Sequence, residues 1–264
     1  MITKSKFTTV FFLIVFFDIL LSAAPVFAAD EEPGRPEYTI KRRTEKIVID
    51  GILDDADWAA CRSLGPLKFP WYNYEKYPEV QKAELELTDV KILWDDDFLY
   101  IAYICEDKHI WADHYDSHSH TYKDDCVEFF WNPDPAAGNA YNMFEINCIG
   151  NMLACYNNFE RRTRLTDRII MVPHVAQTVR GSVNWDGDLD EGWVIELALR
   201  FEDYPELLKE RPRDGTLWRA GINRCGGMTN WQDSMWAPEF GKIVGNFHLY
   251  PYFGKLLFSE ELVK

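Results

Sequence analysis

The chain has 264 residues, with 43 acidic and 28 basic side chains and a formal net charge of −15 at neutral pH. Such an acidic surface repels polyanions, so nucleic acid and anionic membrane surfaces are poor partners. The length suits one large β domain, and an aromatic content of 15% with ten tryptophans fits either sugar binding or a thick β core.

The N-terminus has the pattern of a secretory signal peptide. Lys4 and Lys6 precede an apolar run over 10–21, and small residues end at Ala28; this order is typical of a cleaved signal. The run is short for a membrane span, although an uncleaved anchor is the alternative. We expect residues 1–28 to be removed, leaving a secreted or periplasmic protein without a membrane span.

A polar leader over 29–45 and one β domain over 46–260 follow. The sequence predicts short helices at 53–60 and 204–210 and a ring-rich loop at 62–82. Strands are expected at 47–49, 85–94, 98–105, 123–131, 141–149, 152–157, 172–183, 193–201, 217–225 and 253–258. Many short strands with few helices predict an all-β fold, a jelly-roll-like antiparallel β-sandwich.

The predicted strand at 123–131 carries a charge on one of its faces. Side chains alternate along a strand, so Val127 and Phe129 share one face while Cys126, Glu128 and Phe130 share the other. A carboxylate among apolar neighbours needs a partner. A sugar hydroxyl, a calcium ion or an arginine would each serve, and a core strand with one charge at its rim is the simpler interpretation.

Six cysteines permit three disulfides in a secreted chain. Several of them lie within predicted strands, where free cysteine behaves as a small buried apolar residue. Cys148 and Cys155 flank a Gly150–Asn151 turn and are the best local candidate pair. The absence of a CxxC motif from the sequence argues against a zinc ribbon or a thioredoxin-like site.

Two loops carry candidate metal ligands. The acidic loop after Trp185 contains Asp186, Asp188 and Asp190 with a glycine, which suits the six to eight oxygen ligands of calcium. Four histidines lie between 109 and 121 and would suit a transition metal. For both loops, a solvated polar segment is the alternative.

Seven motifs, each weak alone, occur in one order along the chain. They are IDGILDDADW (49–58), LWDDDFLYIA (93–102), DDCVEFF (124–130), YNMFEIN (141–147), GWVIELAL (192–199), WAP (236–238), and FH (247–248) with FGKL (253–256). In this order the sequence resembles the family 9 carbohydrate-binding modules and their free-standing relatives. The resemblance implies a β-sandwich with structural calcium and a slot in which two aromatic rings hold a sugar.

The resemblance also implies which residues form this slot. The two rings fall at Tyr122, where the family has tryptophan, and at Trp236. The family's carboxylate that binds sugar hydroxyls falls at Glu128, and the family's asparagine position is kept as Asn147. The face of an aromatic ring packs well against the C–H groups of a pyranose, and charged side chains form strong hydrogen bonds with its hydroxyls.

Besides Tyr122, two further slot positions depart from the family pattern. The arginine position is occupied by Glu145, and a glutamine position by Arg224. The two side chains either exchange a charge across the slot or pair with each other, so both are candidate ligand contacts.

We therefore predict a non-catalytic protein that binds a glycan or sugar ligand and serves polysaccharide breakdown, with glycoside hydrolases as candidate partners. Two alternatives stay open. A glycoside-hydrolysing enzyme needs paired carboxylates, for which Glu128 and Glu145 are the candidates. A haem-binding electron-transfer domain of related fold needs a methionine and histidine pair, which no spacing identifies.

Overall fold

The computed structural model describes residues 34–69, 85–158, 163–165, 173–205, 208–229, 232–237 and 246–264, within one unit spanning Gly34–Lys264. The expected signal peptide and most of the expected ring-rich loop, from residue 70 onward, lie outside these residues. In the described part of the chain, no helix is long and apolar enough to cross a membrane.

Twelve strands form one continuous sheet, in the order β7-β6-β5-β4-β10-β12-β1-β2-β3-β9-β8, with β11 paired to β10. The strands are β1 Glu37–Arg42, β2 Thr88–Trp94, β3 Phe98–Glu106, β4 Asp125–Asn132, β5 Ala140–Asn147, β6 Met152–Asn158, β7 Thr163–Leu165, β8 His174–Arg180, β9 Gly192–Arg200, β10 Leu217–Gly226, β11 Ser234–Met235 and β12 Gly254–Leu262. The helical elements are α1 Ala56–Ala60, η2 Thr121–Lys123, η3 Pro135–Ala137, η4 Phe201–Asp203 and η5 Tyr250–Tyr252.

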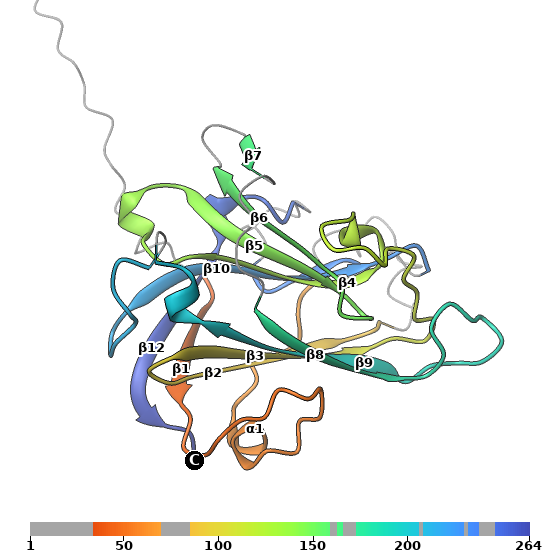
Figure 1. Ribbon diagram of the computed structural model, residues 1–264, viewed down its shortest axis with the longest axis horizontal. Helices are drawn as coiled ribbons and strands as arrows, with labels where there is room; N and C mark the ends of the chain where they lie inside the picture. The colour runs from red at the N-terminus through yellow and green to blue at the C-terminus, as the bar shows by residue number, and fades with distance from the viewer. Residues whose placement is uncertain are drawn as a thin grey trace, which may run out of the picture. The chain divides into compact units, whose positions relative to one another are not determined.

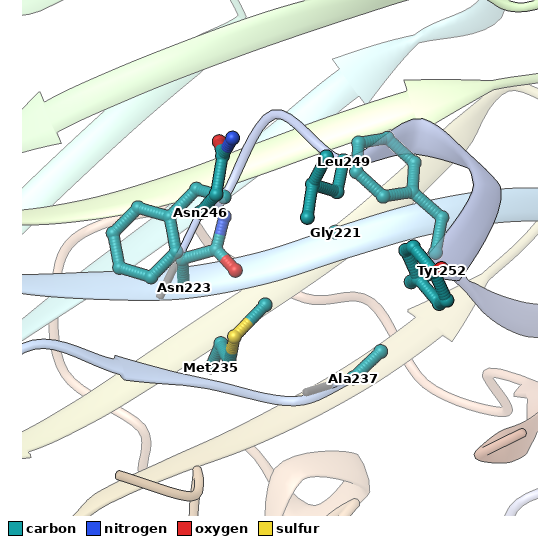
Figure 2. Close-up of a pocket in the computed structure, with 9 residues that line it drawn as sticks. Gly221, Asn223, Met235, Ala237, Asn246, Leu249 and Tyr252 are labelled. Atoms are coloured by element: carbon teal, nitrogen blue, oxygen red, sulfur yellow. The ribbon is translucent and has the colours of Figure 1, made fainter. Parts of the chain in front are cut away.

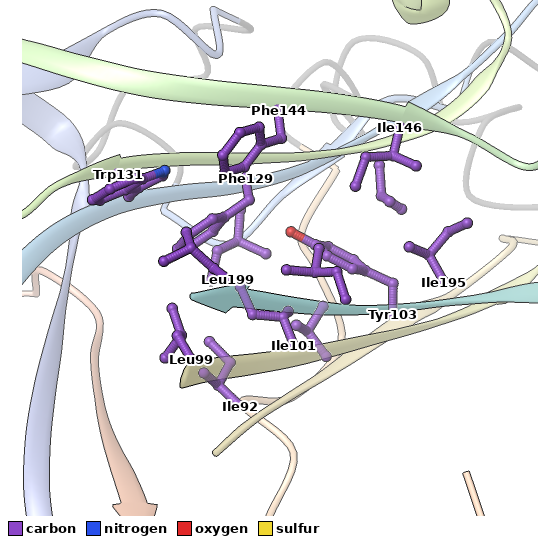
Figure 3. Close-up of a cluster of buried hydrophobic side chains, with 14 of the residues drawn as sticks. Ile92, Leu99, Ile101, Tyr103, Phe129, Trp131, Phe144, Ile146, Ile195 and Leu199 are labelled. Carbon is purple, nitrogen blue, oxygen red and sulfur yellow. The ribbon is translucent and has the colours of Figure 1, made fainter. Parts of the chain in front are cut away.

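The sheet curls into two layers, which confirms the predicted β-sandwich. The layer that contains β4, β5, β6 and β10 lies over the layer that contains β2, β3, β8 and β9 (Figure 1). Side chains from both layers fill the space between them, among them Phe129 and Phe144 from one and Ile101 and Leu199 from the other (Figure 3). The Tyr103 hydroxyl on β3 crosses this core and donates to the Glu128 carbonyl on β4 at 2.9 Å.

β1 corrects the predicted domain boundary. Its residues, 37–42, were expected in a polar leader, but they pair in parallel with both β12 and β2. Ile40 is buried in the core while its polar neighbours face outward. One buried apolar side chain is enough to hold β1 in the sheet, because β12 and β2 hydrogen-bond its backbone on both sides. The expected strand at 47–49 is absent; Ile47 packs on Trp58 without a ladder. The described residues of the expected helix at 204–210, which are 204–205 and 208–210, are not helical, and the short helix η4 ends just before them at Asp203.

A buried arginine joins the two layers. Arg224 on β10 points into the core, because Ala220 and Ile222 on the same face are core residues. Its guanidinium donates to Asp107 Oδ2 at 3.0 Å and to the Glu106 carbonyl at 2.7 Å, both at the end of β3. Further contacts, all from the opposite layer or its loops, are with Thr88 Oγ1, with the backbone and carboxylate of Glu86, and with the ring of Trp193.

Replacing this arginine should be costly. Arg224→Met leaves the buried carboxylate of Asp107 without its cation, so we expect the free energy of unfolding to fall by about 3–5 kcal/mol. Urea denaturation measures the loss. The matched control is Arg213→Met, since Arg213 is 81% exposed and pairs only at the surface; its change should stay within about 0.5 kcal/mol. Equal midpoints for the two variants would contradict the role given to Arg224.

Candidate functional site

The outer face of the β5-β4-β10 layer, which faces away from the core, carries a polar patch. Glu128 lies at its centre. Across the strand ladder it stands directly opposite Glu145 on β5 and directly opposite Asn223 on β10. Strand alternation produces this arrangement, because the neighbours of Glu128 on β4, Val127 and Phe129, face the core.

The patch is nearly closed to solvent. Glu128 is 3% exposed and Glu145 is 1% exposed. Asn223 Nδ2 donates to Glu128 Oε2 at 3.1 Å, while Cys225 Sγ lies 3.6 Å from Glu128 Oε1. Burial raises the pKa of Glu128 well above its usual value, and the negative charge of Glu145 raises it further.

Aromatic rings extend the same face away from the acidic pair. Phe130 stacks on His248 with ring centres 5.2 Å apart, and Tyr141 stacks on Tyr250 at 6.2 Å. The Tyr141 hydroxyl also hydrogen-bonds His248 Nδ1 at 2.9 Å. The segment over 246–253 therefore packs onto this face and covers part of it.

A small cavity lies between β10 and this covering segment. Gly221 and Asn223 form its floor, and Asn246, Leu249 and Tyr252 lie around it (Figure 2). Its volume is about 10 Å³, which is close to the smallest volume that holds one water molecule. A sugar ring does not fit there unless the covering segment moves.

Asn147 and Tyr122 lie at the edge of the patch. Asn147 shares the outer face of β5 with Glu145, but its Nδ2 donates to the His114 carbonyl and to Asp124 Oδ2. Its amide thus holds the neighbouring loop. Tyr122, in η2, is 37% exposed, and the Thr121 hydroxyl attaches η2 to the Glu145 carbonyl at 3.0 Å.

The structure places the other two predicted contacts on the core side. Arg224 points away from Glu145 and pairs with Asp107 and Glu86, so the suggested pairing with Glu145 is wrong. Trp236 was expected to present an exposed ring, but it is 6% exposed within the main core. The ring lies against the backbone of Gly254, at a site where any Cβ would collide with it.

The acidic loop does not gather its three carboxylates around one point. Both carboxylate oxygens of Asp190 accept backbone N–H groups, from Ser182 and Ile110. Asp188 accepts the Ser182 hydroxyl, whereas Asp186 faces His109. These three residues therefore do not fit a calcium cage.

A different set of side chains has metal-ligating geometry. Among the described residues, the one group of three whose ligand atoms all lie within 4.8 Å of one another is Cys126, Glu128 and Cys225. All six cysteines are buried free thiols. Cys148 packs in the core and Cys155 beside the rings of the outer face, so they do not form the candidate pair.

Asn223 and Cys225 were missed as outer-face residues. The sequence signal for this face was the alternation of β10, in which Ala220 and Ile222 are apolar while the alternate residues, such as Arg219, Gly221 and Asn223, are polar or small. Residue types alone did not reveal that β10 lies beside β4, a pairing between segments about 90 residues apart.

The chain matches the family described as carbohydrate-binding family 9 over residues 50–258. It belongs to that family. The family 9 match spans every element of the patch, from β4 through β10 to the covering segment, and it confirms the resemblance. Neither this match nor the solved neighbours support the glycoside-hydrolysing or haem-binding alternatives.

Solved structures share the family 9 fold. A candidate carbohydrate-binding protein from Bacteroides uniformis has a TM-score of 0.64 and 19% identity, covering 85% of this chain and 100% of that one. A family 9 module from Caldicellulosiruptor kristjanssonii, in complex with cellotriose, has a TM-score of 0.56 and 15% identity, covering 84% and 94%. The complex of such a module with glucose gives 0.55 and 15%, covering 84% and 96%. No curated protein matches the chain.

The acidic pair predicts how stability depends on pH. Because the pKa of Glu128 is raised on folding, the folded state holds more protons than the unfolded state above about pH 4.5. Stability should therefore fall as pH rises from 4.5 through the raised pKa. Glu128→Gln removes this contribution, so its melting temperature should fall less than that of the wild type between pH 4.5 and 8.

The control for this prediction is Glu191→Gln, whose side chain is 81% exposed. It should follow the wild-type curve. Burial also raises the pKa values of Asp125 and Glu196, but these groups are common to all three proteins and cancel in the comparison. Parallel curves for Glu128→Gln and the wild type would refute the assignment.

Proposed function

We propose that this family 9 protein binds a sugar over the outer-face patch, with Glu128, Glu145 and Asn223 as hydroxyl partners and Tyr122 as a stacking ring at the rim. The observation that carries the proposal is the buried acidic pair. Burying two facing carboxylates destabilises a fold, so their presence on a face that the core does not use favours a ligand role.

The chemistry of the patch suits a sugar. Neighbouring hydroxyls donate to the two oxygens of a carboxylate, and hydrogen bonds with a charged partner are about twice as strong as neutral ones. Asn223 adds an amide next to Glu128. The exposed ring of Tyr122 offers an apolar face for pyranose C–H groups.

Binding in this proposal requires the segment over 246–253 to move from the patch. The cavity beneath it holds only about 10 Å³, far less than a sugar ring. The rings that the segment stacks against, Phe130 and Tyr141, would then be freed to contact the ligand. Trp236 stays in the core, and its role is to support β10 and β12 from beneath the patch.

The wider setting of the protein is also part of the proposal. The signal-like N-terminus supports a secreted or periplasmic location, where polysaccharides are encountered. Solved family 9 modules in complex with cellotriose and glucose support a β-glucan or its fragments as ligand. In this setting the protein would serve glycoside hydrolases that break down the same glycan.

Sugar binding can be tested by calorimetry with glucose and cellotriose. We expect the wild type to bind at least one of them, and Tyr122→Ala to lower the affinity by about tenfold through lost stacking. Glu145→Gln should lower it by about tenfold or more, since it removes a charge-assisted hydrogen bond. Glu191→Gln, away from the patch, is the control. Unchanged affinity in both patch variants would place the ligand elsewhere.

Structural calcium is a further part of the proposal, although the acidic loop does not supply its ligands. If the protein binds structural calcium, adding a chelator should lower its melting temperature, and restoring calcium should reverse the loss, because an ion that binds only the folded state stabilises it. Differential scanning calorimetry with and without chelator measures this. An unchanged transition would remove calcium from the description of the protein.

A further inference from the structure

Two thiols and a carboxylate converge on the outer face, where β4 begins and β10 ends. Cys126 and Glu128 lie two residues apart on β4, so they share this face. Cys225 stands directly opposite Cys126 on β10. Their ligand atoms lie within 4.8 Å of one another, and all three side chains are buried.

We propose that Cys126, Cys225 and Glu128 form a binding site for a soft divalent cation of the zinc class. This site goes beyond sugar binding, because it needs no sugar and uses thiols that the sugar proposal does not involve. Thiolates are the preferred ligands of such cations, and a carboxylate completes many of their sites.

The distances suit tetrahedral coordination. With metal–sulfur bonds of about 2.3 Å and metal–oxygen bonds of about 2.0 Å, sulfur and oxygen ligands lie about 3.5 Å apart. Cys225 Sγ and Glu128 Oε1 already lie 3.6 Å apart. The remaining separations, at most 4.8 Å, close by about 1 Å, which is within the reach of side-chain rotation about a fixed backbone.

Glu128 is held in the orientation that a ligand needs. Asn223 Nδ2 donates to Oε2, and this leaves Oε1 directed at Cys225. Outer hydrogen bonds of this kind typically orient carboxylate ligands in metal sites. Glu145 stands directly opposite Glu128 on β5, but its carboxylate is not part of the group of three, so the fourth ligand of a tetrahedral cation would be a water molecule.

The surroundings of the three groups favour a cation. The charged groups that act on them through space are acidic, namely Glu145, Asp124 and Asp233. The nearest arginine in sequence, Arg224, points to the other face and pairs with Asp107. A bound cation would neutralise this cluster and release the thiol protons.

Cobalt reports such a site directly, because thiolate-bound Co²⁺ gives sulfur-to-metal charge-transfer absorption together with tetrahedral d–d bands. We expect the phosphine-reduced protein to bind one Co²⁺ per chain with both signals, and Zn²⁺ to displace it. Cys126→Ser and Cys225→Ser should each lower the charge-transfer intensity by about half or more. Cys155→Ser, a buried thiol of the same face outside the cluster, should leave it unchanged.

A second measurement covers variants that fold poorly. Zn²⁺ should raise the melting temperature of the reduced wild type and of Cys155→Ser, but not that of Glu128→Gln, which keeps the shape of the side chain. Absence of charge transfer in the reduced wild type would overturn the proposal. A Cys126–Cys225 disulfide that persists in reductant would overturn it as well, since the pair would then be a cross-link.

The two proposals fail separately. The cobalt titration contains no sugar, and the sugar assay relies on Tyr122→Ala, which lies outside the thiol cluster. If the protein binds sugar but not cobalt, only the metal-site proposal is refuted. If it binds cobalt but not sugar, only the sugar-site proposal is refuted.

Discussion

Arg224 carries a full positive charge between two β layers, where an unpaired charge would be strongly destabilising. Burial lowers its pKa, but the acidic groups around it, including Cys105 and Asp107, outweigh this effect and leave the pKa above its usual value. Every partner belongs to the opposite layer or to the loops at its edge. Because a guanidinium has five donors in a fixed plane, these contacts fix how the layers meet at this end of the sandwich.

The layer that carries Arg224 is buried on both faces. All eight residues of β4 are buried, although only alternate ones meet the core. The core face is apolar and fixed by packing, whereas the outer face combines acids, thiols and rings. Stability alone would place apolar side chains on both faces of such a strand. The polar outer face is thus the part of the molecule that the fold does not require and that function explains best.

Much of this architecture could be predicted from the sequence. Short runs rich in β-branched and aromatic residues, bounded by turn residues, predicted β2, β3, β4, β9 and β10. β1 escaped prediction because only Ile40 of its residues is deeply buried, so its strand character comes from neighbours distant in sequence. The family pattern placed Glu128 and Glu145 on the patch, yet it also nominated Arg224 and Trp236, which face the core. A motif match predicts which residue occupies a family position, but the strand register decides which face of the sheet its side chain lies on.

The first strand of the domain lies in parallel beside the last. Tyr38 pairs with Leu256 and Ile40 with Phe258, so β1 has no complete ladder until more than two hundred further residues have been synthesised. Contacts over such a separation form slowly, because a long loop must close before they are gained. The sandwich therefore cannot be completed during synthesis, because β1 cannot pair with β12 until the last strand has been made.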